Sequence, residues 1–415
     1  MTDGTSHVAP GEIIDRAWRE KRWPTSLLER ARALPIPDTQ IERLLSWNVP
    51  LERFELEVAW AEKLVNGDMQ FRQVTFADAD AFRELWANAP EEIGDWDVTA
   101  ERGANAFAQF ELQERPVLNA LFDKTAMVAC VSFSLRNAIV AGRRLSVRFG
   151  QAMRVHKDHR RHGYGNWVRS LPWAIGLNMA TEVQYDYIRS RNMLMERWNS
   201  THMPNVDSVP KREDDVPGIP VSVLQYGARA TTPHQDIRSA RAEDLRACVS
   251  LINRTHRGRD LFRPYTPEFL EDCLDPGFQP SGPQAPTPVY SFDDYYVVER
   301  SGRIVACAGA WDRGRDIREY WRNRGTNEER AIAVMSMLDV GYDEGESRAL
   351  ASLVEHFISL AHHRGRDYLV APLERFPDVA SLLVGYEPIV DTRYMQWRAD
   401  DPAITSPIHL DLRYW

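Results

Sequence analysis

The chain has 415 residues, of which 43% are hydrophobic and 27% are charged, and its formal net charge is −9. This length exceeds one compact hydrophobic core, so we expect two or three structural units. The acidic balance argues against a nucleic-acid partner, because a basic face supplies most of the affinity for phosphate backbones. The four cysteines show no CxxC spacing, and neither a signal-peptide run nor an apolar stretch of about 18 residues is present. We therefore expect a cytoplasmic protein with no membrane span.

Residues 1–68 are predicted to form a helical N-terminal cap. Ser26 with Glu29, and Thr39 with Glu42, have the spacing of a capping box and precede Leu-rich segments. A periodic helix over 51–65 ends before Asn66-Gly67. Such a segment either packs on a neighbouring domain or forms a separate partner-binding module.

Residues 69–232 are predicted to form the first of two α/β units. Alternation of apolar and polar residues indicates strands over 70–75, 116–123, 127–135, 145–155 and 182–188, with helices over 78–87 and 163–179. A Pro-rich stretch over 200–235 contains the short strand 221–226. This order places several strands in one mixed sheet.

Residues 233–415 repeat this order and predict a second unit. Ile237 begins a strand, a turn with an acidic residue and a helix, as Phe71 does in the first unit. A hairpin is expected around Ser301-Gly302, followed by a strand over 331–340, a helix over 347–362 and a strand over 366–372. The sequence thus predicts an internal duplication: an α/β (α+β) fold with two mixed β-sheets, each flanked by helices.

A basic loop follows the predicted strand 145–155 and reads Arg160-Arg161-His162-Gly163-Tyr164-Gly165. Its two glycines allow several backbone N–H groups to turn toward one point, and the following helix N-terminus adds free donors. Arginine side chains match phosphate oxygens. We therefore predict a diphosphate pocket, although the loop has neither the GKS/T ending of a P-loop nor a dinucleotide fingerprint. The histidines at 156, 159 and 162 lie among positive charges, which disfavours a metal.

The segment resembles the signature of the GNAT (GCN5-related N-acetyltransferase) family, Val-x-Pro-x-x-Arg-x-x-Gly-x-Gly/Ala. Val155, Arg160, Gly163 and Gly165 match it, with Lys157 in place of Pro. The resemblance implies two GNAT-like units that bind acetyl-CoA or another acyl-CoA as co-substrate. It also implies a coenzyme A site in which the main chain of Met153, Arg154 and Val155 pairs with the pantetheine arm. The remaining residues that it implies are Arg160, the amides of Arg161, His162, Gly163, Tyr164, Gly165 and Asn166 at the diphosphate, and Asn192 at the arm.

The catalytic groups usual in that family are missing from this sequence. Phe149 stands where a Glu base is common, and Asn199 where a Tyr acid is common. Asp186, Tyr185 and Tyr187 on the next strand are possible substitutes, while core packing is the alternative for each.

A polar segment after the first helix of this unit is a candidate acceptor site. Glu92, Asp95 and Trp96 could hold a cationic amine by charge and cation–π contact, and a solvated loop is the alternative.

In the second unit, Val340 aligns with Val155, but the following loop is acidic and lacks the paired glycines. An acidic loop repels a diphosphate, so one site in the first unit is expected. We interpret the chain as an acyl-CoA-dependent N-acyltransferase in which a small amine attacks the thioester directly. The alternatives are other acyl-CoA chemistry on the same fold, such as decarboxylation or O-acyl transfer, and a non-catalytic CoA-responsive module.

Overall fold

The computed structural model describes most of residues 66–397 and the C-terminal segment. The described residues are 24–33, 55, 58, 59, 62, 63, 66–162, 164, 165, 168, 183–189, 218–232, 234–274, 289–397, 404 and 407–415. The predicted helix over 163–179 and most of the predicted cap lie outside them. In the cap, α2 (Thr25–Ala33) is present after Pro24, close to the predicted capping box. No helix within these ranges is long and apolar enough to cross a membrane.

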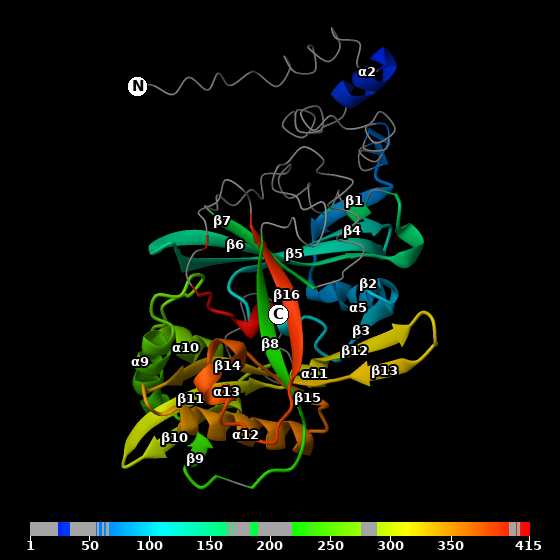
Figure 1. Ribbon diagram of the computed structural model, residues 1–415. Helices are drawn as coiled ribbons and strands as arrows, with labels where there is room; N and C mark the ends of the chain where they lie inside the picture. The colour runs from blue at the N-terminus through cyan, green and yellow to red at the C-terminus, as the bar shows by residue number, and fades with distance from the viewer. Residues whose placement is uncertain are drawn as a thin grey trace, which may run out of the picture.

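One large sheet runs through the molecule (Figure 1). It has twelve strands within the described residues, eleven of them between Met69 and Ala371 in the sequence. In spatial order these strands are β1 (Met69–Gln73), β4 (Pro116–Asp123), β5 (Ala126–Val140), β6 (Arg143–Val155), β7 (Val183–Arg189), β16 (Ile389–Trp397), β8 (Gly218–Gly227), β15 (Tyr368–Ala371), β14 (Val334–Tyr342), β11 (Arg303–Trp311), β10 (Tyr295–Arg300) and β9 (Ile237–Ser239).

The two halves of this sheet exchange strands at its centre. β8 is the last strand of the first unit in the chain but pairs with β15 of the second, and β16, near the C-terminus, pairs with β7 of the first. β8 and β16 then pair with each other over Ile389 to Gln396. Figure 1 shows them crossing the middle of the molecule between the two units. The two units therefore share one continuous hydrogen-bonded sheet.

The internal duplication is visible in the same local motif at both edges of the sheet. Asp78 accepts hydrogen bonds from the guanidinium of Arg72 (2.6 and 2.7 Å) and from the amide of Thr75. Asp244 accepts the same bonds from Arg238 (2.6 and 3.0 Å) and from the Arg241 amide. In each unit the carboxylate thus fixes the turn between the first strand and a helix.

Helices cover the faces of the sheet. They are α5 (Ala79–Asn88), α6 (Ala108–Glu111), α9 (Leu245–Thr255), α10 (Pro267–Leu274), α11 (Arg313–Asp316), α12 (Ser347–His363) and α13 (Pro377–Ala380), with short 3-10 turns η1 (Phe76–Asp78), η2 (Lys157–His159), η3 (Ala242–Asp244), η4 (Phe292–Asp294), η5 (Leu373–Arg375) and η6 (Leu412–Tyr414). The predicted helix over 347–362 is confirmed as α12, which buries Leu350, Leu353, Val354, Phe357 and Ile358 against the sheet. Their spacing of three and four residues is the reason the segment is helical.

A second, smaller sheet joins the units beside the large one. It consists of β2 (Glu91–Ile93), β3 (Trp96–Arg102), β12 (Ile317–Asn323) and β13 (Glu329–Ile332), and β3 pairs with β12 along its whole length. The segment that could have been a solvated loop is therefore a β-hairpin, because its partner strand comes from the second unit. The single strand expected over 331–340 is also divided at Ala333, whose amide donates to Asp367 (2.7 Å).

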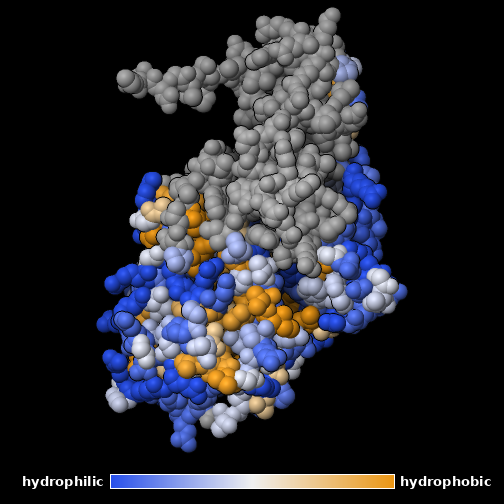
Figure 2. All heavy atoms as spheres, viewed as in Figure 1, coloured by the Kyte–Doolittle hydropathy of each residue, from blue (hydrophilic) through white to orange (hydrophobic). Residues whose placement is uncertain are grey.

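The hairpin expected around Ser301-Gly302 is confirmed, with both residues at positive φ (49° and 72°), as a tight turn between β10 and β11 requires. Figure 2 shows a mainly hydrophilic face with hydrophobic side chains toward its middle. Ile389 and Val390 at the start of β16 are exposed hydrophobic residues.

Candidate functional site

Two neighbouring parallel strands of the first unit separate near the centre of the large sheet. β6 and β7 are paired only from Val147 with Val183 to Gly150 with Asp186. Beyond this point β7 pairs with β16 on its other side, and β6 remains paired with β5. Within the described residues, the edge of β6 over 151–155 that faces β7 has no strand partner. Backbone groups at such an edge can bind an extended ligand.

The basic loop begins where this edge of β6 ends. η2 follows β6, and Arg161 then takes a left-handed conformation (φ 68°), which costs a non-glycine residue on the order of 1 kcal/mol. Strain of this kind is common in ligand-binding loops. Tyr164 is buried, and its ring lies beside those of His159 (5.7 Å) and His162 (5.8 Å). Gly163, Asn166 and Asn192, which the sequence predicts at the coenzyme, lie outside the described residues.

The side chains of Met153 and Val155 anchor the loop. They pack against a cluster that contains Tyr164 and Val168. A β-carbon placed on Gly165 would meet Val155 Cγ2 at 3.5 Å, an ordinary contact. The protein itself therefore leaves room for a small side chain at 165. Within the part of the chain that is described, no group of three or more His, Cys, Asp or Glu side chains is placed to hold a metal.

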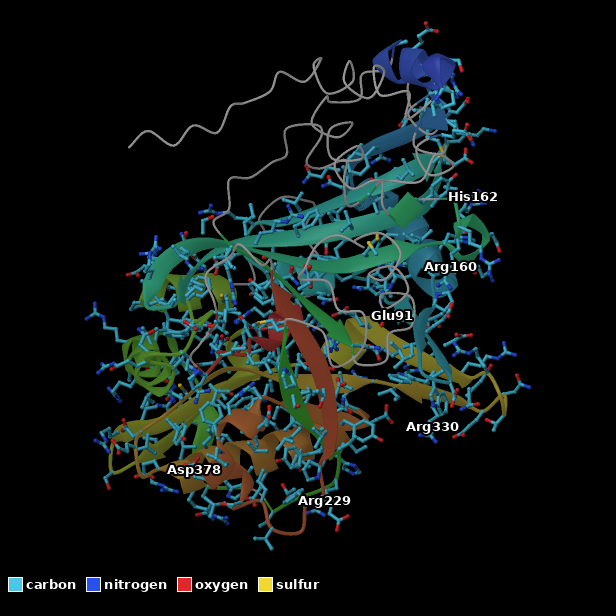
Figure 3. The ribbon with its side chains drawn as sticks, turned by 45° about the horizontal axis from the view of Figure 1, so that its top comes forward. Glu91, Arg160, His162, Arg229, Arg330 and Asp378 are labelled. Carbon is cyan, nitrogen blue, oxygen red and sulfur yellow. The ribbon has the colours of Figure 1, made fainter. Side chains whose placement is uncertain are left out.

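Two arginines at this end of β6 are bound by the residues around β2. Arg154 forms an ion pair with Glu91, and Arg160 donates to Glu92 Oε1 (3.1 Å) and to the Pro90 carbonyl. Figure 3 shows Glu91 and Arg160 on the same side of the first unit. The guanidinium of Arg160 is thus held by the hairpin, and the exposed Arg161 side chain is available at the loop.

A cavity of about 160 Å³ lies between the separating strands and the smaller sheet. Cavities of about 150 Å³ hold a ligand the size of benzene. Both units form its walls. The lining residues include Trp86, Glu91, Val98, Val131, Phe133, Phe149, Gly150, Gln151, Arg154, Asp186, Tyr187 and Arg189 from the first unit and Arg313, Ile317, Glu319, Arg393, Tyr414 and Trp415 from the second.

Ion pairs across the unit boundary run along one wall of this cavity. Arg189 pairs with Glu319 (2.5 Å) and with Glu91 (3.7 Å), and Arg313 reaches Glu319 at 3.5 Å. Burial would raise the pKa of Glu319, but Arg189 and Arg313 outweigh it and hold the pKa at about 2. Burial is outweighed in the same way at Glu91, whose pKa is held below its usual value by Arg154 and Arg189. Both carboxylates are therefore ionised at neutral pH.

The three predicted catalytic candidates occupy different environments. Asp186 and Tyr187 line the cavity, and Asp186 lies where β6 and β7 part. Tyr185 does not line it: its hydroxyl accepts a hydrogen bond from buried Arg136 (2.7 Å), and its ring packs on Phe149. Burial raises the pKa of Tyr187, so its hydroxyl stays protonated at neutral pH. Asp186 and Tyr187 thus both line the cavity, and Tyr185 lies in the core.

Phe149 occupies the position on β6 at which a Glu base is common in the family that the sequence resembles. Its ring packs against Tyr187 (5.1 Å) and Tyr414 (5.0 Å) as part of an aromatic cavity wall. Gln151 donates to the side-chain oxygen of Gln113. β6 therefore contributes an amide, an aromatic ring and the guanidinium of Arg154 to the cavity, and the carboxylates come from other strands, Glu91 from β2, Asp186 from β7 and Glu319 from β12.

The predicted acceptor residues lie on the β2–β3 hairpin, beside the cavity rather than in it. Glu92 holds Arg160, Asp95 is exposed in the turn, and Trp96 packs edge-on against Trp321 (6.3 Å). Their neighbour Glu91 lines the cavity instead.

Sequence reasoning missed most charged residues of the cavity wall. Arg313, Glu319 and Arg393 belong to the second unit, far along the chain from β6. One signal was present: Ile317, Glu319 and Trp321 alternate along β12 and are its less exposed positions. A carboxylate on the apolar face of a strand indicates a paired or functional charge.

The equivalent opening in the second unit is filled by the protein itself. β14 and β15 pair only from Val334 to Ser336 on β14, as β6 and β7 do over a short stretch. The carboxylate of Asp339 then accepts hydrogen bonds from Arg413 (2.6 and 2.7 Å), Tyr265 (2.8 Å) and Tyr290 (3.0 Å), which fix the C-terminal segment against β14. In the following loop, Asp343 and Glu346 pair with arginines of the same unit.

The fold and the site together define a protein of two α/β units that share one large mixed sheet, with an open strand gap in the first. Comparison with protein-family models and with curated proteins gives no match. Among solved structures, N-myristoyltransferase from Saccharomyces cerevisiae with bound myristoyl-CoA is similar, with a TM-score of 0.53, 11% identity and coverage of 81% of this chain and 80% of that chain. Another structure of that protein with bound myristoyl-CoA has a TM-score of 0.53, 12% identity and coverage of 83% and 88%. At this identity the similarity establishes the fold alone, and it confirms the predicted α/β fold class with mixed β-sheet flanked by helices.

Proposed function

We propose that the chain is an acyl-CoA-dependent N-acyltransferase with one site, in the first unit, that acylates a small amine by direct attack. The observation that carries this proposal is the separation of β6 and β7 after Gly150, with the basic loop at one end and a carboxylate-lined cavity at the other. A thioester whose arm follows the free edge of β6 would present its carbonyl to the cavity.

The coenzyme site would use backbone groups more than side chains. The main chain of Met153 to Val155 would pair with the pantetheine arm, and the amides from Arg161 to Asn166 would hold the diphosphate. Asn192 would contact the arm. The Arg161 side chain is exposed and its backbone is left-handed. Both features are compatible with a loop residue that turns toward a bound anion.

The chemistry would use Asp186 and Tyr187. Asp186 would accept a proton from the acceptor ammonium, and the free amine would then attack the thioester carbonyl carbon. As the new C–N bond forms, the C–S bond breaks, the nitrogen loses its second proton to solvent, and Tyr187 protonates the leaving thiolate. Asp186 then returns the first proton to solvent. A tyrosine with a raised pKa is a proton donor at neutral pH and regains its proton from solvent.

The acyl group would be short, with acetyl as our first choice. A cavity of about 160 Å³ has room for a short acyl group beside a small acceptor, and its wall carries ionised groups that a long alkyl chain would desolvate. The acceptor would be a small molecule with an amine group.

The test is acyl transfer by the purified full chain with acetyl-CoA and longer acyl-CoA thioesters against a panel of amines. CoA release and product mass are measured together. Asp186→Asn should lower kcat by about 10²- to 10⁴-fold with unchanged acyl-CoA affinity, whereas Asp80→Asn, on the exposed surface of α5, should have no effect. CO₂ release from malonyl-CoA, or tight acyl-CoA binding without transfer to any acceptor, would overturn the proposal.

A further inference from the structure

Buried Arg393 and half-buried Arg189 face each other across the strand exchange. Arg393 on β16 is directly opposite Arg189 on β7 in the antiparallel pairing, and the Arg393 side chain is 7% exposed. Residues directly opposite on neighbouring strands have β-carbons about 5 Å apart, so like charges there destabilise the sheet. Nearby carboxylates or a bound anion must offset this repulsion between the two guanidinium groups.

The two arginines differ in how well the protein compensates them. Arg189 is neutralised by Glu319 and Glu91. Among the described residues, the carboxylate nearest to Arg393 in an ion pair is Asp391 at 3.9 Å, beyond hydrogen-bond distance, and that carboxylate already accepts from the Trp415 indole (3.1 Å). Glu319 acts on Arg393 through its charge, without an ion-pair contact. Within the described residues, the buried Nε of Arg393 has no hydrogen-bond partner. Its guanidinium lies over the Trp415 ring (4.1 Å) and lines the cavity.

The charges around the cavity do not balance. The lining contains four guanidinium groups and three carboxylates, and one further group of each sign, Arg102 and Asp391, lies behind it. The lining groups are Arg154, Arg189, Arg313, Arg393, Glu91, Asp186 and Glu319. Five positive and four negative groups leave one positive charge in excess among the described residues. Burial and the neighbouring Arg189 accordingly lower the pKa of Arg393 to about 9.

The two signs of charge are separated along β7. Asp186 lies at the strand parting, and Arg189, opposite Arg393, is three residues further on, which is about 10 Å of strand. Asp186 therefore lies toward the thioester side of the cavity, and the positive charge in excess, on Arg393, lies toward the strand exchange. We propose that the acceptor is a small zwitterion of the amino-acid class, whose carboxylate is bound by Arg393 and Arg313 while its amine faces Asp186. This inference rests on the proposed acyltransferase function.

Matched acceptors test this specificity. Acyl transfer is measured for an amino acid, its carboxamide and its decarboxylated amine, with the wild-type chain and Arg393→Met, which keeps an unbranched side chain over Trp415. We expect kcat/KM of the wild type to be at least about 100-fold higher for the amino acid. In Arg393→Met this preference should fall to about threefold, with the rate for the decarboxylated amine retained. Arg229→Gln, on the exposed loop after β8 (Figure 3), is the matched control and should keep the wild-type preference.

A stability measurement separates a binding role of Arg393 from a structural one. Removing an uncompensated buried charge should leave the Tm unchanged or raise it, because the repulsion with Arg189 disappears. Equal transfer to amines with and without a carboxylate, or a lower Tm with equal loss for all acceptors, would overturn the inference. Calorimetry of amino-acid binding in the presence of CoA does not depend on turnover. If the amino acid binds and binding requires Arg393, but no acyl group is transferred to it, the proposed acyltransferase function is contradicted while the inference about the ligand class stands.

Discussion

The carboxylate of Asp186 lies over the α-carbon of Gly150, at the last residue pair that joins β6 to β7. A β-carbon built on Gly150 would be 2.1 Å from Asp186 Oδ1 and 3.2 Å from its Cγ. Gly150 thus gives Asp186 the space to point along the gap between the strands. The position needs a glycine because of this close approach, and its φ is not in the left-handed region.

Gly150→Ala should reduce activity without unfolding the protein. The clashing atom is the end of a side chain, so the carboxylate can move, but it would leave the position from which it would accept the amine proton. We expect kcat to fall about 100-fold or more, while acyl-CoA affinity and the Tm change little. Gly227→Ala is the matched control, because a β-carbon there meets no atom within 4 Å. Full activity of Gly150→Ala would remove Asp186 from the proposed mechanism.

The loop glycines give a test of the coenzyme site. Gly163→Val should abolish acyl-CoA binding in calorimetry, because the side chain would occupy the space of the diphosphate. Gly165→Ala should bind within about threefold of the wild type, since its β-carbon makes only an ordinary contact with Val155. Unchanged affinity of Gly163→Val would show that the diphosphate binds elsewhere.

The second unit should not contribute to coenzyme binding. Arg348 aligns with the loop of the first unit, but it is exposed and donates to the Leu382 carbonyl (3.4 Å). Arg348→Ala is therefore expected to keep the affinity and a stoichiometry of one acyl-CoA per chain. Two binding events in calorimetry, or a large loss of affinity, would assign a site to the second unit as well.

Local signals in the sequence were sufficient for most strands, for α12 and for the duplication. The period of two in 145–155 and the repeated Arg…Asp motif at Arg72 and Arg238 depend on neighbours within a few residues. The loop with its glycines and the candidates Asp186 and Tyr187 were predicted from the same kind of signal, because each belongs to one short segment.

Features that depend on the other half of the chain could not be predicted. β16 pairs with β7, and β12 with β3, across more than 200 residues, and periodicity gives no partner for a strand. Glu91 could therefore not be distinguished from Glu92, since only the tertiary structure directs one to the cavity and the other to Arg160. The positive charges of Arg313 and Arg393 were missed because both residues reach the cavity from the second unit.

Glu319 should stabilise the protein in a pH-dependent way. Its pKa is lowered from 4.5 to about 2, so its contribution is complete above about pH 4.5 and is lost as the pH falls toward 2. The shift corresponds to about 3 kcal/mol at neutral pH. Glu319→Gln should lower the free energy of unfolding by about this amount at pH 7, and by much less at pH 3, in urea titrations. A pH-independent difference would mean that the ion pairs with Arg189 and Arg313 contribute little.

The buried pair of Asp339 and Arg413 should be a major determinant of stability and of the cavity shape. Both side chains are at most 3% exposed, and two tyrosine hydroxyls complete the coordination of the carboxylate. Arg413→Leu leaves Asp339 charged without its cation, which costs about 3–5 kcal/mol for a buried pair. The double variant with Asp339→Asn should recover most of this loss, because the uncompensated charge is gone.

Arg413→Leu should also affect the cavity, whose walls include residues of the first unit. Tyr414 and Trp415 directly follow Arg413 and form part of the cavity wall, so a displaced C-terminal segment would withdraw both rings and the ring that supports Arg393. We expect Arg413→Leu to raise KM for the acceptor about tenfold or more while acyl-CoA affinity is retained. Normal acceptor kinetics in a variant that has lost the expected stability would show that the segment stays in place without its ion pair, held by the packing of the two aromatic side chains.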